Sequence, residues 1–139
     1  MTKFIGNVPI SESTGLYTMS TSMRDIKSVN PAMLGVIPLK SKLVFAGATT
    51  SSVANNGEFI SVMVEARKDG SAGEKLIEGR GIVLSGNTQK AIFELVEGKI
   101  KHDAPTLEKG TVLYCSVDYK AGSTPKMQDL LVTIALSEN

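Results

Sequence analysis

An alternation of apolar and polar residues runs through much of the chain from residue 41 to the end. Segments 58–67, 111–119 and 129–137 carry an apolar side chain at every second position. Because successive side chains of a strand point to opposite faces of a sheet, each segment is predicted to be a half-buried β-strand. The side chains expected to point together into one core are Ile60, Val62, Val64, Leu113, Cys115, Val117, Leu130, Val132, Ile134 and Leu136.

Shorter runs predict three further strands, at residues 41–48, 74–84 and 90–97. In the last of these, Ala91, Phe93 and Leu95 would share one face. Loops rich in Gly, Asn, Asp and Ser separate the runs, and no segment has a convincing helical period. Six or more short strands with turn signals between them predict an antiparallel β-sandwich or barrel.

Two glycines interrupt the segment 74–84. Gly79 and Gly81 flank Arg80 within the predicted strand. Glycine inside a strand weakens regular pairing and often marks a bulge, so a bulge or bend is expected there. The spacing does not form a phosphate-binding glycine loop, because it is not placed between a strand and a helix.

The first forty residues have a different composition. They hold three of the five prolines, many Ser and Thr and few charges. We interpret residues 1–40 as an extended N-terminal arm with one or two edge elements, and residues 41–139 as the β-sandwich domain. Residues 30–35 (NPAMLG) could also form one helical turn, with Asn30 as its cap and Gly35 after its end.

Such an arm carries few side chains that could bury its own surface. Ordering the backbone costs roughly 1–2 kcal/mol per residue, so contacts from elsewhere must hold the arm in place. Strand addition to a neighbouring chain is one possibility, and packing on its own sandwich as an edge strand or cover is the other. The arm residues expected to bind a partner are Phe4, Ile5, Val8, Ile10, Leu16 and Tyr17.

Charge and composition exclude several functional classes. Fifteen Lys and Arg against 14 Asp and Glu give a net charge of +1. This balance creates no field that would attract a nucleic acid or an anionic membrane, so neither is expected as a partner. The N-terminus lacks the apolar core of a signal peptide, and no apolar run approaches the roughly 20 residues of a membrane span. The single Cys fits synthesis in a reducing cytoplasm.

Candidate chemistry is sparse. His102 stands beside Asp103 in a charged loop with no nucleophile assigned to it, so a solvated loop histidine is the better interpretation. Cys115 lies on the apolar face of its strand and is interpreted as a core residue. The carboxylates show no spacing that selects a catalytic or metal-binding pair. We therefore predict no enzyme, no catalytic residue, no metal and no cofactor.

The succession of strands across residues 41–137 resembles a jelly-roll or a related viral β-sandwich. The segments that carry this resemblance are SKLVFAGATTS, EFISVMVEARKDG, EKLIEGRGIVL, KAIFELVEG, TLEKGTVLYCSVDY and DLLVTIALSE. With the Ser/Thr/Pro-bearing arm, the small size and the near-neutral charge, the chain resembles bacteriophage head decoration (cement) proteins. The resemblance implies a homotrimer on the capsid exterior that clamps adjacent subunits of the major capsid protein.

Two other functional classes stay open at this point. One is a ligand- or carbohydrate-binding β-sandwich module of a phage fibre or a bacterial surface, although Trp is absent and three Tyr supply few stacking platforms for sugars. The other is an enzyme built on the same fold, since a fold does not determine a function.

Overall fold

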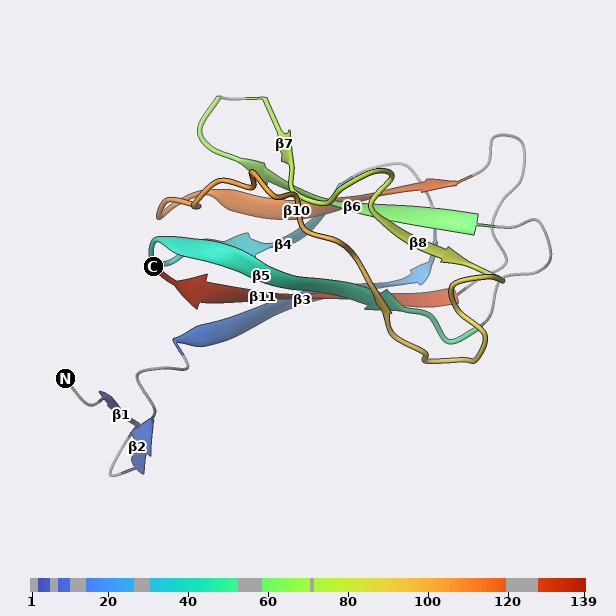
Figure 1. Ribbon diagram of the computed structural model, residues 1–139, viewed down its shortest axis with the longest axis horizontal. Helices are drawn as coiled ribbons and strands as arrows, with labels where there is room; N and C mark the ends of the chain where they lie inside the picture. The colour runs from blue at the N-terminus through green and yellow to red at the C-terminus, as the bar shows by residue number, and fades with distance from the viewer. Residues whose placement is uncertain are drawn as a thin grey trace.

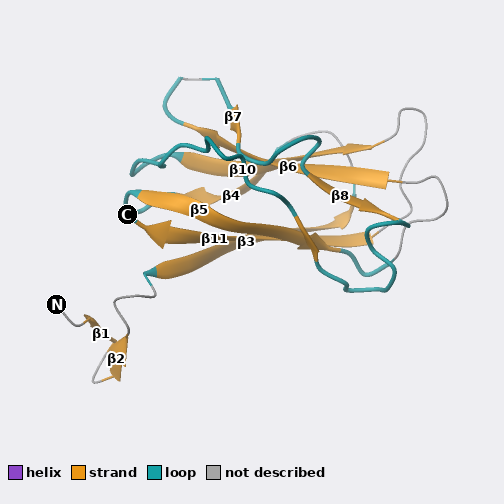
Figure 2. Cartoon of the chain, viewed as in Figure 1, coloured by secondary structure: helices purple, strands orange, loops and turns teal. Residues whose placement is uncertain are grey.

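The described part of the protein is entirely β-structure. The computed structural model describes residues 3–5, 8–10, 15–26, 31–52, 59–70, 72–119 and 128–139. Within these ranges there is no helix, and two antiparallel sheets lie one above the other (Figures 1 and 2). The predicted antiparallel all-β sandwich is confirmed, whereas the jelly-roll strand order implied by the resemblance stays a prediction.

The first sheet has the order β4–β10–β6–β7, and β8 also pairs with β6. Its strands are β4 (Ala32–Val36), β10 (Val112–Tyr119), β6 (Phe59–Arg67), β7 (Glu74–Lys75) and β8 (Ile82–Ser85). Strands β6 and β10 form its centre and pair over eight residues of β10. We call it the β4–β10–β6 sheet.

The second sheet has the order β3–β11–β5–β9. Its strands are β3 (Leu16–Asp25), β11 (Gln128–Glu138), β5 (Ser41–Thr49) and β9 (Val96–Glu97). Strand β11 pairs with β3 on one side and with β5 on the other along most of its length. We call it the β3–β11–β5 sheet. Separately from both sheets, β1 (Lys3–Ile5) pairs with β2 (Val8–Ile10).

The space between the two sheets is filled by the side chains that the alternation selects. Of the ten predicted core residues, all except Val117 are completely buried, and Val117 is half-buried against the same cluster. The predicted core is therefore confirmed. Residues outside the predicted set complete it, including Ile37, Leu76 and Ile77, which are fully buried although they lie outside regular strands.

The predicted interruption at Gly79 and Gly81 is confirmed. Strands β7 and β8 both pair with β6, and residues 77–81 leave this pairing between them. Both glycines have positive φ, of 62° and 95°. A Cβ on Gly81 would lie 2.3 Å from the carbonyl oxygen of Val62, so only glycine allows the turn to lie this close to β6.

Two local predictions are wrong. Residues 32–36, within the proposed helical turn, form strand β4, because pairing with β10 satisfies their backbone instead; Asn30 lies outside the described residues. The strand predicted at 90–97 is reduced to Val96–Glu97, and Ala91, Phe93 and Leu95 are exposed on a loop. The alternation of residues 90–97 does not make them a strand, because the buried polar residue Gln89 holds this segment as a loop, as described below.

Within the N-terminal segment, β3 and β4 are the edge elements that the composition suggested. Strand β3 is the outer strand beside β11, and β4 is the outer strand beside β10. Tyr17, Met19 and Met23 pack against the core, and Ile26 is buried. Residues 16–26 and 31–36 thus follow the alternative in which this segment completes its own sandwich.

This arrangement predicts the outcome of two truncations. Deleting residues 1–30 removes β3, which exposes one edge of β11 and uncovers part of the core, so cooperative unfolding should be lost. Deleting residues 1–14 keeps β3 and serves as the control, with a melting temperature close to that of the full chain. Thermal melts followed by circular dichroism distinguish the two. A cooperative transition in the longer truncation would show that β3 is dispensable.

Candidate interaction surfaces

The predicted partner-binding residues fall into two groups. Phe4, Ile5, Val8 and Ile10 belong to β1 and β2, and their side chains lie outside the described residues. Leu16 and Tyr17 are neighbours on β3 and therefore point to opposite faces. Leu16 is exposed, whereas the hydroxyl of Tyr17 lies 2.5 Å from Ser41 Oγ and its ring packs on the core. A role in partner binding stays a prediction for all six.

The outer face of the β3–β11–β5 sheet has almost no charge. Its outward positions alternate with the buried ones and hold small or apolar side chains on all three strands. We define the uncharged face by these residues: Leu16, Thr18, Ser20, Ser22, Val44, Phe45, Gly47, Thr49, Leu131, Thr133, Ala135 and Ser137. Charged residues occur at its borders, at Arg24, Lys42, Asp129 and Glu97.

A bulge adds to the apolar area of this face. The register between β5 and β11 shifts at Ala135–Leu136. As a result, neither Val44 nor Phe45 is buried. A Cβ on Gly47 would lie 2.8 Å from Leu95 Cδ1 and 2.9 Å from Phe45 Cζ. Phe45 and Leu95 therefore lie directly against the backbone of Gly47. The uncharged face therefore meets the loop that carries Leu95 at Gly47, beside the exposed Glu97.

That loop, residues 90–95, is fixed from inside by Gln89. The Gln89 side chain is completely buried; its Oε1 accepts a hydrogen bond from Thr50 Oγ1 at 2.8 Å, and its Nε2 donates to the carbonyl of Glu94 at 3.2 Å. The Glu94 carboxylate accepts hydrogen bonds from the backbone N–H groups of Lys90 and Ala91, at 2.7 and 3.0 Å. The loop is held by specific polar contacts, not by burial of its apolar side chains.

The apolar side chains of this loop point into solvent. Ile92 is 57% exposed and Phe93 is 67% exposed. Phe93 has a φ of 61°, a conformation that a bulky residue rarely adopts, and its N–H donates to the carbonyl of Thr50 at 2.9 Å. Strain of this kind costs on the order of 1–3 kcal/mol, persists only where surrounding contacts impose it, and is typical of functional loops.

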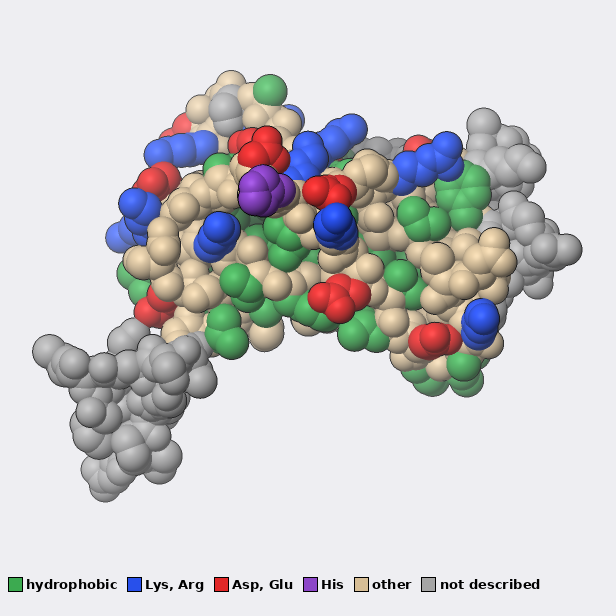
Figure 3. Space-filling view, in the orientation of Figure 1, with side chains coloured by type: hydrophobic (Ala, Val, Ile, Leu, Met, Phe, Trp, Pro, Cys, Tyr) green, Lys and Arg blue, Asp and Glu red, His purple; other side chains and the backbone are tan. Residues whose placement is uncertain are grey.

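The outer face of the β4–β10–β6 sheet is different in character. It carries Arg67, Glu65 and Asp118 among its outward residues, and Figure 3 shows charged side chains gathered mainly over the upper part of the molecule, where this sheet lies. Two hollows open on it. One, of about 460 Å³, is lined by apolar residues such as Met33 and by the charged Arg67 and Asp69; the other, of about 760 Å³, lies around Ser61 and Asp118.

The residues considered for catalysis do not form a reactive arrangement. His102 and Asp103 are exposed on a turn, and Cys115 is completely buried. Desolvation by burial raises the pKa of the Cys115 thiol from 9.0 to about 11, which leaves it protonated at neutral pH. The described residues include no group of His, Cys, Asp and Glu suited to a metal ion.

The raised pKa predicts a loss of stability in alkali. The folded protein keeps the Cys115 proton up to about pH 11, whereas the unfolded chain releases it near pH 9.0. Between these values the unfolded state binds fewer protons, so stability falls as pH rises, by about 1.4 kcal/mol per pH unit. Urea unfolding at neutral and alkaline pH should show a loss about 1–3 kcal/mol larger for the wild type than for Cys115→Ala. Equal losses in the two proteins would contradict the assignment.

Comparison with known proteins gives no assignment. No family model, no curated protein and no solved structure matches the chain. In the ranges that the structure describes, no helix is long and apolar enough to cross a membrane.

Proposed function

We propose that the protein is a non-enzymatic structural component of a virus particle, a capsid decoration protein made in the host cytoplasm and bound to the capsid exterior. In this role it binds and stabilises adjacent subunits of the major capsid protein. The observation that carries the proposal is the uncharged face, together with the loop 90–95, whose exposed Ile92, Phe93 and Leu95 extend it. The resemblance of the strand succession to head decoration proteins supports the choice of partner.

The composition of the uncharged face is that of a protein-binding surface. Exposed Leu or Val side chains are common on any protein and carry little information singly. Depletion of charged residues across a contiguous area does distinguish the centre of an interface from ordinary surface. Here three adjacent strands present Ser, Thr, Ala and apolar side chains, while charges are confined to the borders. A face of this kind suits another protein surface better than a small ligand.

The size of the face explains why more than one copy would be needed. On β11 the face spans the seven residues 131–137, which at about 3.3 Å each and with three strands about 4.8 Å apart gives roughly 330 Å². A specific interface buries about 800 Å² on each partner. The loop 90–95 adds to the area, and a homotrimer would present three such faces to neighbouring subunits at once, so that their affinities reinforce one another. Self-association as a homotrimer is therefore part of the proposal.

Replacing Leu131 by Lys tests the role of the uncharged face. Leu131 is 40% exposed on the central strand of the face, so the charge is tolerated in the free protein but is desolvated in the complex. Binding to assembled capsids of the encoding virus, measured by co-sedimentation, should weaken at least about tenfold, or about 1.4 kcal/mol. Leu39→Lys is the matched control, because Leu39 is 53% exposed in the turn between β4 and β5.

Both variants should keep the melting temperature of the wild type, since each adds a charge at an exposed position. Leu39→Lys should sediment with capsids as the wild type does. Capsid binding unchanged in Leu131→Lys would exclude the uncharged face as the binding surface. Failure of the wild-type protein to sediment with capsids would overturn the proposed function itself.

A further inference from the structure

The larger hollow on the β4–β10–β6 sheet is a second candidate site, separate from the uncharged face. Its floor is formed by central strands, where Asp118 pairs across from Ser61 and Ser116 pairs across from Met63. Ser61 and Met63 are each only 7% exposed although they belong to the outward set of β6. Neighbouring residues therefore surround them, and together they enclose a hollow of about 760 Å³.

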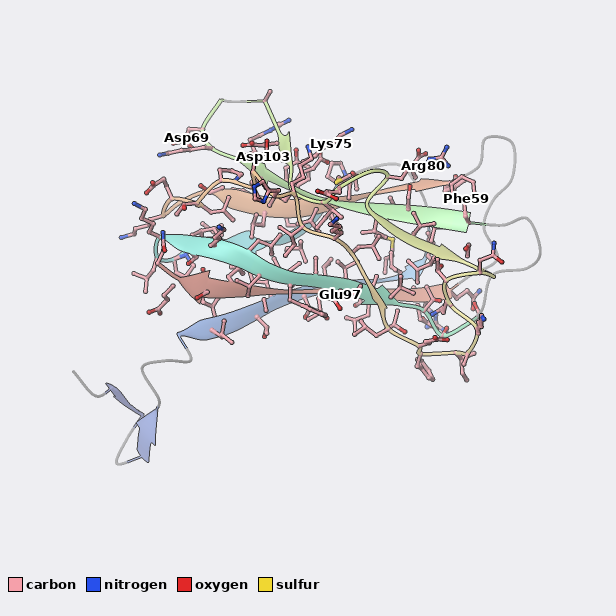
Figure 4. All side chains as sticks on the ribbon, in the orientation of Figure 1. Phe59, Asp69, Lys75, Arg80, Glu97 and Asp103 are labelled. Atoms are coloured by element: carbon pink, nitrogen blue, oxygen red, sulfur yellow. The ribbon has the colours of Figure 1, made fainter. Side chains whose placement is uncertain are left out.

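One wall is built by the turn that contains Arg80. Gly79 and Gly81 have positive φ on either side of Arg80, and the Gly81 N–H donates to the carbonyl of Glu78 at 3.1 Å. The Arg80 guanidinium lies over the Phe59 ring, 5.7 Å from its centroid, and Figure 4 shows the two side chains close together. Stacking of this kind holds the guanidinium plane while its N–H groups remain available at the edge.

The floor supplies acceptors. Asp118 Oδ1 accepts the backbone N–H of Tyr119 at 2.9 Å, which orients the carboxylate. Ser116 donates its hydroxyl proton to Glu65 Oε2 at 3.0 Å, so its oxygen keeps lone pairs that can accept. Lys75 and Tyr119 complete the lining.

From this arrangement we infer that the hollow binds a short acidic glycan, one or two sugar units of a polysaccharide that carries carboxylates. Arg80 offers a forked donor set that matches a sugar carboxylate, and Asp118 accepts from a sugar hydroxyl. The hydroxyls of Ser61 and Ser116 match the mixed donor and acceptor character of a sugar ring. Phe59 and Tyr119 contribute apolar edges.

The Arg80 guanidinium favours an acidic sugar over a neutral one, because its fork of donors pairs with a carboxylate. The lining holds Lys75 and Arg80 against Asp118, and the Glu65 carboxylate lies beside it, 3.0 Å from Ser116 Oγ. The volume lies within the range of about 300–1,000 Å³ that is typical of small-ligand pockets. Because the hollow and the uncharged face belong to opposite sides of the sandwich, a protein bound to a capsid through the uncharged face would keep this hollow toward the surroundings (Figure 1). The glycan site does not depend on the proposed function.

Titration calorimetry with the trisaccharide of galacturonic acid tests the inference, with maltotriose as the neutral comparison. The wild-type protein should bind the acidic trisaccharide with a Kd of about 1 mM or tighter and should bind maltotriose at least about tenfold more weakly. Arg80→Gln should weaken acidic binding at least about tenfold. Asp118→Asn should not weaken it, because it removes an opposing negative charge and keeps an acceptor oxygen. Arg67→Gln is the matched control, because Arg67 stacks on Tyr114 at 5.8 Å on the same sheet but away from the hollow.

The melting temperatures of all three variants should match that of the wild type, so that a loss of binding reports on the site. Absence of binding to the acidic trisaccharide, equal binding of maltotriose, or binding unchanged in Arg80→Gln would each overturn the inference. Co-sedimentation of Arg80→Gln with capsids separates this result from the proposed function, because the capsid-binding face lies on the other sheet and should be unaffected.

Discussion

Burial of the inward side of β11 is the interaction on which the rest of the structure depends. Leu130, Val132, Ile134 and Leu136 are all completely buried, and they join the inward side chains of β6 and β10 in one core. Strand β11 also pairs with both β3 and β5, so its register determines theirs. A slip of one residue would bring Leu131, Thr133 and Ala135 inside and expose the four buried side chains. The core therefore fixes which residues form the uncharged face.

Much of this could be predicted from the sequence because a period of two is a direct consequence of strand geometry. The inward sets of β6, β10 and β11 follow from the alternation, and the interruption of the sheet at Gly79 and Gly81 follows from glycine chemistry. The loop at 90–95 could not be predicted in this way. Its Ala91–Phe93–Leu95 alternation is that of a strand, but the decisive contacts come from Gln89 and Thr50, which are 39 residues apart in sequence.

The candidate surfaces were harder to predict than the core. The hollow around Asp118 combines residues from β6, β10 and the turn at Arg80. No local spacing in the sequence indicates that these three segments lie side by side. The N-terminal segment was correctly expected to supply edge elements, and the pairing of β3 with β11 shows where the longer one lies. Alternation predicts which side chains share a face, whereas the partner of each strand depends on contacts distant in sequence.

The two outer faces divide the molecule into a side suited to protein contact and a side suited to a polar ligand. Charges are nearly absent from the first and abundant on the second, while the shared core keeps the two faces on opposite sides of one rigid sandwich. In the proposed account, this division gives the protein two independent binding surfaces. It would also set the orientation of the protein on the particle to which it is proposed to bind.

An electron cryo-microscopy reconstruction of particles that carry the protein tests this orientation most directly. The account predicts density for the protein on the capsid exterior, with the β3–β11–β5 sheet and the loop 90–95 against the capsid subunits and the β4–β10–β6 sheet facing solvent. Density in which the β4–β10–β6 sheet lies against the capsid, with Leu131 and Phe93 exposed to solvent, would contradict it.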